Sequence, residues 1–112
     1  MRNYFPRWLI AEFVKQINQE VFNNALPIKE LIVKQYRKPS EFCALYWDYE
    51  IQIFTTNHPD TPELFSTIAH EMIHFYQDCL DIPINHGGAF FRYYSRKCQE
   101  LYDINRKTFA GY

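Results

Sequence analysis

The sequence is poor in glycine, in cysteine and in net charge. Three glycines among 112 residues argue against a loop-dominated or low-complexity chain. The cysteines, Cys43, Cys79 and Cys98, are widely spaced and form no Cys-x-x-Cys pair, so they predict neither a disulfide framework nor a zinc knuckle. A formal net charge of -1 gives no bulk electrostatic reason to expect strong binding to nucleic acid.

Long apolar runs and targeting signals are also missing. No apolar run approaches the roughly twenty residues that a membrane-spanning helix needs, and the residues from Met1 to Pro6 lack the apolar core of a signal peptide. Together with the cysteine pattern, these absences predict a cytoplasmic protein without a membrane partner. What is abundant is core material, 47% hydrophobic and 19% aromatic residues, so we expect residues 1–112 to form a single domain.

The first half of the sequence predicts one helix followed by three strands. Apolar residues recur at three- and four-residue spacing from about Trp8 to Phe22 and predict an amphipathic helix that Asn23-Asn24 end. Runs of β-forming residues then predict strands at 31–36, 42–47 and 50–55. Because the connections are short and Asp48-Tyr49 can make a tight turn, we expect a three-stranded meander.

The second half predicts two helices. Thr61 is the expected N-cap of the first, with Pro62 at its first helical position, and this helix is expected to run to about Asp78. The last helix is expected from about Ala89 to Asn105. The predicted fold class is α+β, in the order α-β-β-β-α-α, with the helices packed on a small three-stranded sheet.

A metal-binding motif lies inside the first of these two helices. The segment His70-Glu71-Met72-Ile73-His74 matches H-E-x-x-H. Residues four apart share one helix face, about 6 Å apart along the axis, so His70 and His74 can reach one zinc ion at about 2.0–2.1 Å. Glu71 is offset around the helix, where we expect it to act as the general base on the metal-activated water.

A catalytic zinc site needs a third protein ligand and an open position for water. His86 is the favoured third ligand because eleven residues separate it from His74, enough for the chain to leave the helix and return. The neighbouring Gly87-Gly88 would let the backbone approach a crowded site. Glu100 is the alternative, as the carboxylate ligand of a thermolysin-like arrangement.

Other residues near the motif are less suited to bind the ion. Asp78 lies about 12 Å along the helix axis from His70, too far to share its ion, so we expect it to support the site from outside the ligand shell. Gln77 and Leu80 stand where the metzincin motif requires Gly and His, which excludes that motif. His58, in an Asn-His-Pro loop, is expected to be an exposed turn residue.

At these residues the sequence resembles the SprT-like family of zinc metalloproteases. The resemblance rests on the H-E-x-x-H motif at 70–74 and on residues 86–90, which match the family's H-G-x-x-F. Weaker support comes from Phe22-Asn23 followed by Leu26-Pro27, and from strands that lead into the motif helix. The resemblance covers roughly residues 13–101, and its two-part motif is fairly specific.

The resemblance implies a minimal zincin-like domain that hydrolyses peptide bonds in intracellular proteins. It implies that His70, His74 and His86 bind zinc and that Glu71 is the catalytic base. In the family member Spartan, the substrates are proteins crosslinked to DNA. Many relatives carry a zinc ribbon or a basic DNA-binding region after the protease core, and neither pattern follows here. We therefore expect a protein or peptide substrate, with weaker support for DNA as a partner.

Two further expectations concern the substrate and the alternatives. We expect the strand at 50–55 to be the sheet edge on which an extended peptide pairs through its backbone. A catalytically silent zinc-containing module that binds a protein or DNA partner is the main alternative, with the locally basic segment 92–107 as its contact surface. An interaction protein without any metal is the other. The oligomeric state does not follow from the sequence.

Overall fold

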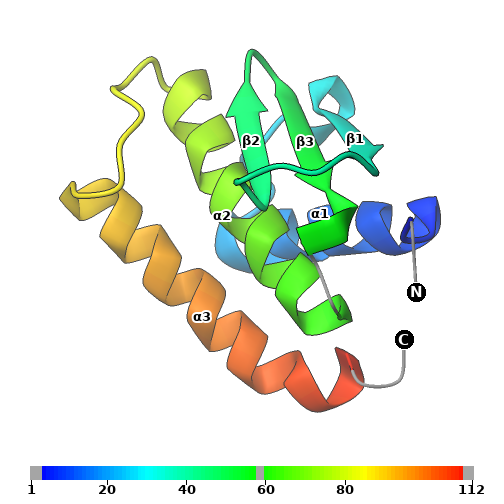
Figure 1. The fold of residues 1–112 in the computed structure, drawn as a ribbon. Coiled ribbons are helices and arrows are strands. Elements are labelled where there is room, and N and C mark those ends of the chain that lie inside the picture. Colours follow the sequence, from blue (N-terminus) through cyan, green and yellow to red (C-terminus); the bar gives the residue numbers. More distant parts are fainter. Residues whose placement is uncertain (1–3, 58–59, 110–112) are drawn as a thin grey trace.

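A computed structural model describes residues 4–57 and 60–109, without the side chains of 107–109. Its regular elements follow the predicted order α-β-β-β-α-α, so the α+β class is confirmed. The elements are α1 (Arg7–Val21), η1 (Ile28–Glu30), β1 (Ile32–Tyr36), β2 (Ala44–Trp47), β3 (Glu50–Phe54), η2 (Thr55–Asn57), α2 (Thr61–Cys79) and α3 (Ala89–Phe109). Figure 1 shows how these elements are arranged.

The sheet is mixed, and its strand order is β1-β3-β2. Strand β2 pairs with β3 antiparallel, because the two-residue turn at Asp48 and Tyr49 joins them with φ angles of 46° and 65°. Strand β1 instead pairs with β3 in parallel. The predicted meander is therefore wrong. The segment 37–43 between β1 and β2 is long enough to carry the chain past the position of β3.

The central place of β3 also corrects the predicted peptide-binding edge. Strand β3 has neighbours on both sides, so it offers no open edge to an extended peptide. Its two core-facing residues, Ile51 and Ile53, are completely buried, as expected for the central and most buried strand. The edge strands are β1 and β2.

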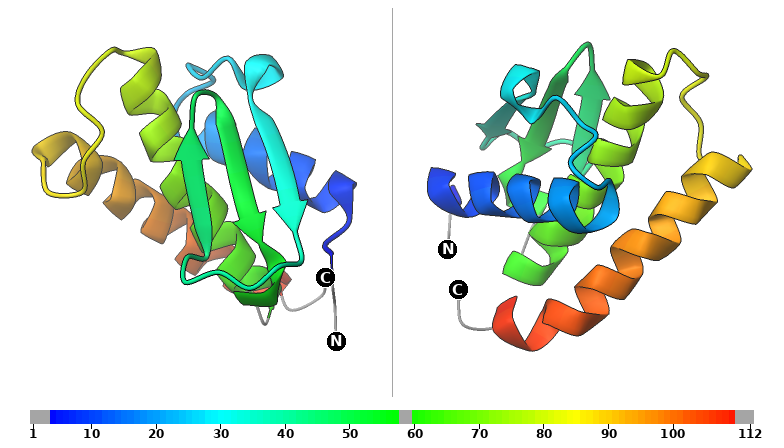
Figure 2. Two further views of the ribbon diagram at one scale, coloured as in Figure 1. Left: turned by 45° about the horizontal axis from the view of Figure 1, so that its top comes forward. Right: turned by 180° about the vertical axis from the view of Figure 1, so that it is seen from behind.

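The helices lie on one side of the sheet (Figure 2). Helix α2 packs against β2 and α1, and α3 packs against both α1 and α2. The core between these layers contains large side chains that are almost fully buried, among them Leu9, Phe13, Ile17, Leu64, Phe65, Ile68, Met72 and Phe75. None of the helices in the described part of the chain combines the length and apolar character needed to cross a membrane.

Helix α2, which carries the motif, begins at Thr61, one residue earlier than predicted. Asp60 is the N-cap, and its side chain accepts a hydrogen bond from the backbone N–H of Glu63 at 3.1 Å. The prediction that Thr61 caps the helix is wrong. Asp60 caps it instead, because an aspartate side chain satisfies the exposed N–H groups and its negative charge complements the positive end of the helix dipole.

Candidate metal centre

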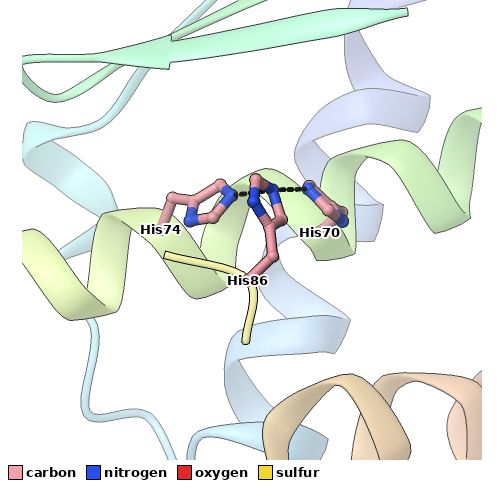
Figure 3. A group of neighbouring side chains, drawn as sticks. All are labelled: His70, His74 and His86. Carbon is pink, nitrogen blue, oxygen red and sulfur yellow. Dashed lines mark hydrogen bonds between the residues drawn. The ribbon is translucent and has the colours of Figure 1, made fainter. Parts of the chain in front are cut away.

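Three histidine side chains from two segments converge at one point (Figure 3). His70 and His74 come from α2, and His86 comes from the loop between α2 and α3. The Nε2 atom of His86 lies 3.2 Å from Nε2 of His70 and 3.1 Å from Nε2 of His74. One ligand atom from each residue lies within 4.8 Å of the others, so these three residues could hold a metal ion.

The spacing of these nitrogen atoms fits zinc better than it fits hydrogen bonds. A histidine Nε2 atom carries at most one hydrogen atom, so His86 cannot make a well-aligned hydrogen bond to both neighbours. Tetrahedral zinc with bonds of about 2.0–2.1 Å holds adjacent ligand nitrogens about 3.3 Å apart. The separations of 3.1 and 3.2 Å lie close to that value.

A buried glutamine fixes the orientation of His74. The Nδ1 atom of His74 lies 2.8 Å from Oε1 of Gln77, and Nε2 of Gln77 donates to the backbone carbonyl of Asn85 at 3.1 Å. Because the Asn85 carbonyl needs a donor, the Gln77 amide must turn its oxygen toward the histidine. Nδ1 of His74 therefore carries the hydrogen, and its Nε2 is left as the electron-pair donor that a metal requires.

The end of α2 directs the chain back toward the histidines. Asp81 adopts a left-handed conformation with φ of 55°. The backbone N–H of Ile82 donates to the carbonyl of Gln77, and that of Asp81 donates to the carbonyl of Asp78, both at 3.0 Å. This pair of bonds is a Schellman motif, which ends the helix and reverses the chain direction.

Asn85 then anchors the loop next to His86. Its side-chain oxygen accepts a hydrogen bond from the backbone N–H of Gly88 at 3.0 Å, just before α3 begins. A Cβ atom at Gly88 would lie 3.0 Å from this same oxygen, whereas a Cβ atom at Gly87 would meet nothing within 4 Å. At Gly88 the close approach is therefore to the side chain of Asn85 and not to the histidines, and at Gly87 there is none.

Phe91, in the first turns of α3, packs against all three imidazole rings. Its ring centroid lies 5.1 Å from that of His70, 5.2 Å from that of His74 and 5.1 Å from that of His86. Burial in these surroundings, together with the neighbouring histidines, lowers the pKa of His70 to about 4, and burial also lowers the pKa of His74. Both rings are consequently neutral near pH 7, which is the form that binds metals.

Glu71 lies beside the histidine cluster without joining it. Its side chain is buried, and the ligand group contains only the three histidines. Burial raises the pKa of Glu71 to about 7. On a helix, Glu71 is rotated by about 100° from His70, so its side chain leaves α2 in a different direction. The site therefore combines three imidazoles with the buried carboxyl group of the residue that follows His70.

The structure separates the other predicted candidates from the cluster. Asp78 accepts a hydrogen bond from the hydroxyl of Tyr46 at 2.7 Å, on the side of α2 that faces the sheet, so its predicted support of the site is wrong. Gln77 performs that role. Glu100 is exposed and is not part of the ligand group. His58 lies outside the described residues.

Sequence reasoning missed three residues that position the ligands: Gln77, Asn85 and Phe91. A signal for Gln77 was present, because it follows His74 by three residues and so shares its helix face. Asn85 and Phe91 flank the third ligand closely in the sequence, but their contacts with α2 depend on how the loop returns. No local spacing rule gives that return path.

Comparison with known proteins identifies no relative of this chain. No protein-family model, no curated protein and no solved structure matches this chain. The likeness to the SprT-like family accordingly rests on the motif residues themselves, at 70–74 and 86–90.

Proposed function

We propose that this protein is a zinc-dependent metallopeptidase that hydrolyses peptide bonds in other proteins. His70, His74 and His86 would hold the zinc ion. The observation that carries the proposal is the convergence of their three Nε2 atoms beside the buried carboxyl group of Glu71. A bound zinc ion would make water more acidic and polarise a substrate carbonyl group.

Glu71 is the general base of this proposal. Its carboxylate would accept the proton of the attacking water and return a proton to the leaving amine. A carboxyl group with a pKa of about 7 is suited to both steps near neutral pH, and a nearby cation would favour its ionised form. Gln77 and Phe91 keep the histidine rings in place during these steps through the contacts described above.

Strand β2 is the sheet edge that suits an extended substrate. It is an edge strand and packs against α2, to which Tyr46 is also tied through Asp78. Two of its side chains, Leu45 and Trp47, are exposed. A peptide added to β2 would pair through its backbone, which gives affinity with little dependence on sequence.

The alternative is a silent zinc-containing module that binds a protein or DNA partner. A structural zinc site is closed by four protein ligands, whereas a catalytic site keeps one position open. Within residues 4–57 and 60–106, the ligand group contains three histidines and no fourth residue. The side chain of His86 is exposed, so the site has a solvent-facing side. This arrangement favours catalysis over a closed structural site.

DNA-associated proteins are one class of substrate within this proposal. Arg92, Arg96 and Lys97 are exposed on α3, which begins directly after the loop with His86. If these residues recruit DNA, adding double-stranded DNA should increase the rate of cleavage of a DNA-bound protein, and the increase should fall steeply with salt concentration. A rate that DNA does not change would restrict the proposal to substrates free of DNA.

The experiment that tests the proposal compares two carboxyl groups. Protein loaded with one equivalent of zinc is incubated with fluorescently labelled casein, an unfolded protein substrate. Glu71→Gln should retain zinc by elemental analysis and lose hydrolysis by at least about 100-fold, as expected for removal of a general base. Glu100→Gln is the matched control, since Glu100 is exposed on α3 and should affect neither zinc nor rate. Full activity in Glu71→Gln would remove Glu71 from its role.

A further inference from the structure

A large hollow in the described part of the protein lies away from the histidines, between α1 and β1. This α1–β1 groove has a volume of about 890 Å³. Its walls include the apolar side chains of Ile10, Val14 and Val33 and the basic residues Arg7, Lys29 and Lys34. No Asp or Glu is among the described residues that line it. The groove is therefore apolar along its floor and positively charged at its rim.

The backbone of β1 faces this groove with open hydrogen-bonding positions. The N–H of Ile32 donates to the carbonyl of Tyr49 at 2.9 Å, so Ile32 directs its backbone groups toward β3. In a parallel ladder, alternate residues direct both backbone groups to the same neighbouring strand. The backbone groups of Val33 and Gln35 therefore point away from β3, along the free edge of the sheet.

One end of the groove already holds a piece of backbone. The side-chain amide of Gln35 accepts a hydrogen bond from the N–H of Phe5 at 2.8 Å and donates one to the carbonyl of Phe5 at 3.0 Å. The two bonds reproduce the pairing of one strand residue with another. The same surface can therefore form hydrogen bonds with the backbone of an extended chain that lies beside β1.

Charge complementarity indicates the kind of chain that fits. Lys34 is partly neutralised by Glu50, whose carboxylate lies 3.4 Å from its Nζ atom. Arg7 and Lys29 are both exposed, and acidic side chains of a bound segment would meet their positive charges. We propose that the α1–β1 groove binds an extended acidic segment of a partner protein, which adds a strand to β1.

The first test measures binding of defined peptides by fluorescence anisotropy without added zinc. The probe is a labelled ten-residue peptide of alternating aspartate and valine, and the control probe has lysine in place of aspartate. The acidic peptide should bind at least about tenfold more tightly, and its affinity should fall as salt is added. Equal binding of the two peptides would overturn the assignment of an acidic partner.

Two variants test whether the peptide occupies the groove. Ala11 lines the groove from an exposed position on α1, so Ala11→Trp should fill it and reduce affinity by at least about tenfold without unfolding the helix. Gln19→Trp is the matched control, because Gln19 is exposed on the same helix and outside the groove. Arg7→Glu combined with Lys29→Glu should weaken binding of the acidic peptide and strengthen binding of the lysine peptide. Unchanged binding in Ala11→Trp would overturn the proposal.

Amide exchange distinguishes strand addition from other modes of binding. Binding should slow exchange of the amide hydrogens of Val33 and Gln35, because these point to the free edge, and should leave those of Ile32 and Lys34 unchanged. Absence of this alternation would rule out an added strand. A wild-type protein that dimerises, together with a monomeric Ala11→Trp variant that binds no peptide, would assign the groove to a second copy and overturn the proposal. The Glu71→Gln variant should bind the peptide normally, so this proposal stands or falls separately from the peptidase.

Discussion

The two halves of the histidine site are held in place by different means. His70 and His74 project from α2, whose other faces bury Ile68, Met72 and Phe75 completely in the core. His86 projects from an exposed loop that is tied to its neighbours at Asn85. The helix half is thus fixed by periodicity and core packing, whereas the loop half depends on a few polar contacts. Metal affinity should therefore be most sensitive to changes in the loop half that leave the fold intact.

The largest effect should come from removing the loop ligand itself. His86→Ala leaves two ligands on α2, so zinc affinity should fall by at least about 100-fold, while the metal-free protein should keep its melting temperature. Zinc affinity is measured by competition with a coloured chelator, and thermal unfolding is followed with EDTA present. Ile84→Ala is the control in the same loop, since Ile84 is exposed. Unchanged zinc stoichiometry in His86→Ala would shift the third ligand to another residue.

Gln77 joins the two halves, and its removal should have the next largest effect. Gln77→Ala removes the acceptor for His74 and the donor to the carbonyl of Asn85 in one change. Loss of such a supporting residue lowers metal affinity by about 10-fold to 100-fold. Gln99→Ala, at an exposed position on α3, is the control. If Gln77→Ala binds zinc like the wild type, contacts other than the bond from Gln77 to the Asn85 carbonyl hold the loop half.

The difference between the halves also explains what the sequence could predict. The relation of His70, Glu71 and His74 follows from helix geometry alone, so the motif residues were identified without the structure. His86 is favoured over Glu100 by the loop length and by the glycines that follow it, and the structure brings His86 to the other two histidines.

The relations that were mispredicted or missed all connect distant parts of the chain. The chain order places β2 between β1 and β3, yet β1 pairs with β3. This pairing depends on which strand takes the central position, and strand spacing does not reveal that. Asp78 was expected at the site, but its bond to Tyr46 lies on the sheet side of α2. The supporting role of Gln77 requires the loop carbonyl of Asn85 as a partner.

The helix half contains two titratable groups, Glu71 and His70, whose burial shifts their pKa values. In metal-free protein, the pKa of Glu71 is raised from 4.5 to about 7, so its stabilising contribution is complete below pH 4.5 and is lost as the pH rises through 7. The pKa of His70 is lowered from 6.5 to about 4, so its contribution is complete above pH 6.5 and is lost as the pH falls through 4. Between pH 4.5 and 6.5 the two groups therefore have opposite effects on stability.

Glu71→Gln separates these two effects. With EDTA present at pH 8, the variant should exceed the wild type in free energy of unfolding by on the order of 2 kcal/mol, because it avoids a buried charge. Its stability should then decrease as the pH falls from 6.5 to 4, because His70 takes up a proton more readily in the unfolded chain than in the folded protein. Urea unfolding at a series of pH values measures both. A variant with the same pH dependence as the wild type would show that Glu71 does not titrate as its burial predicts.

The smallest effect should distinguish two adjacent glycines in the loop half. Neither has a positive φ angle, so alanine introduces no backbone strain at either position. Gly88→Ala places a Cβ atom 3.0 Å from the side-chain oxygen of Asn85 and should weaken the bond that anchors the loop. A weakened hydrogen bond of this kind corresponds to a loss of zinc affinity of about twofold to tenfold. Gly87→Ala meets nothing within 4 Å and should leave zinc affinity unchanged, with a slightly higher melting temperature because the unfolded chain is less flexible. Equal losses in the two variants would mean that loop flexibility, and not the Asn85 anchor, sets the position of His86.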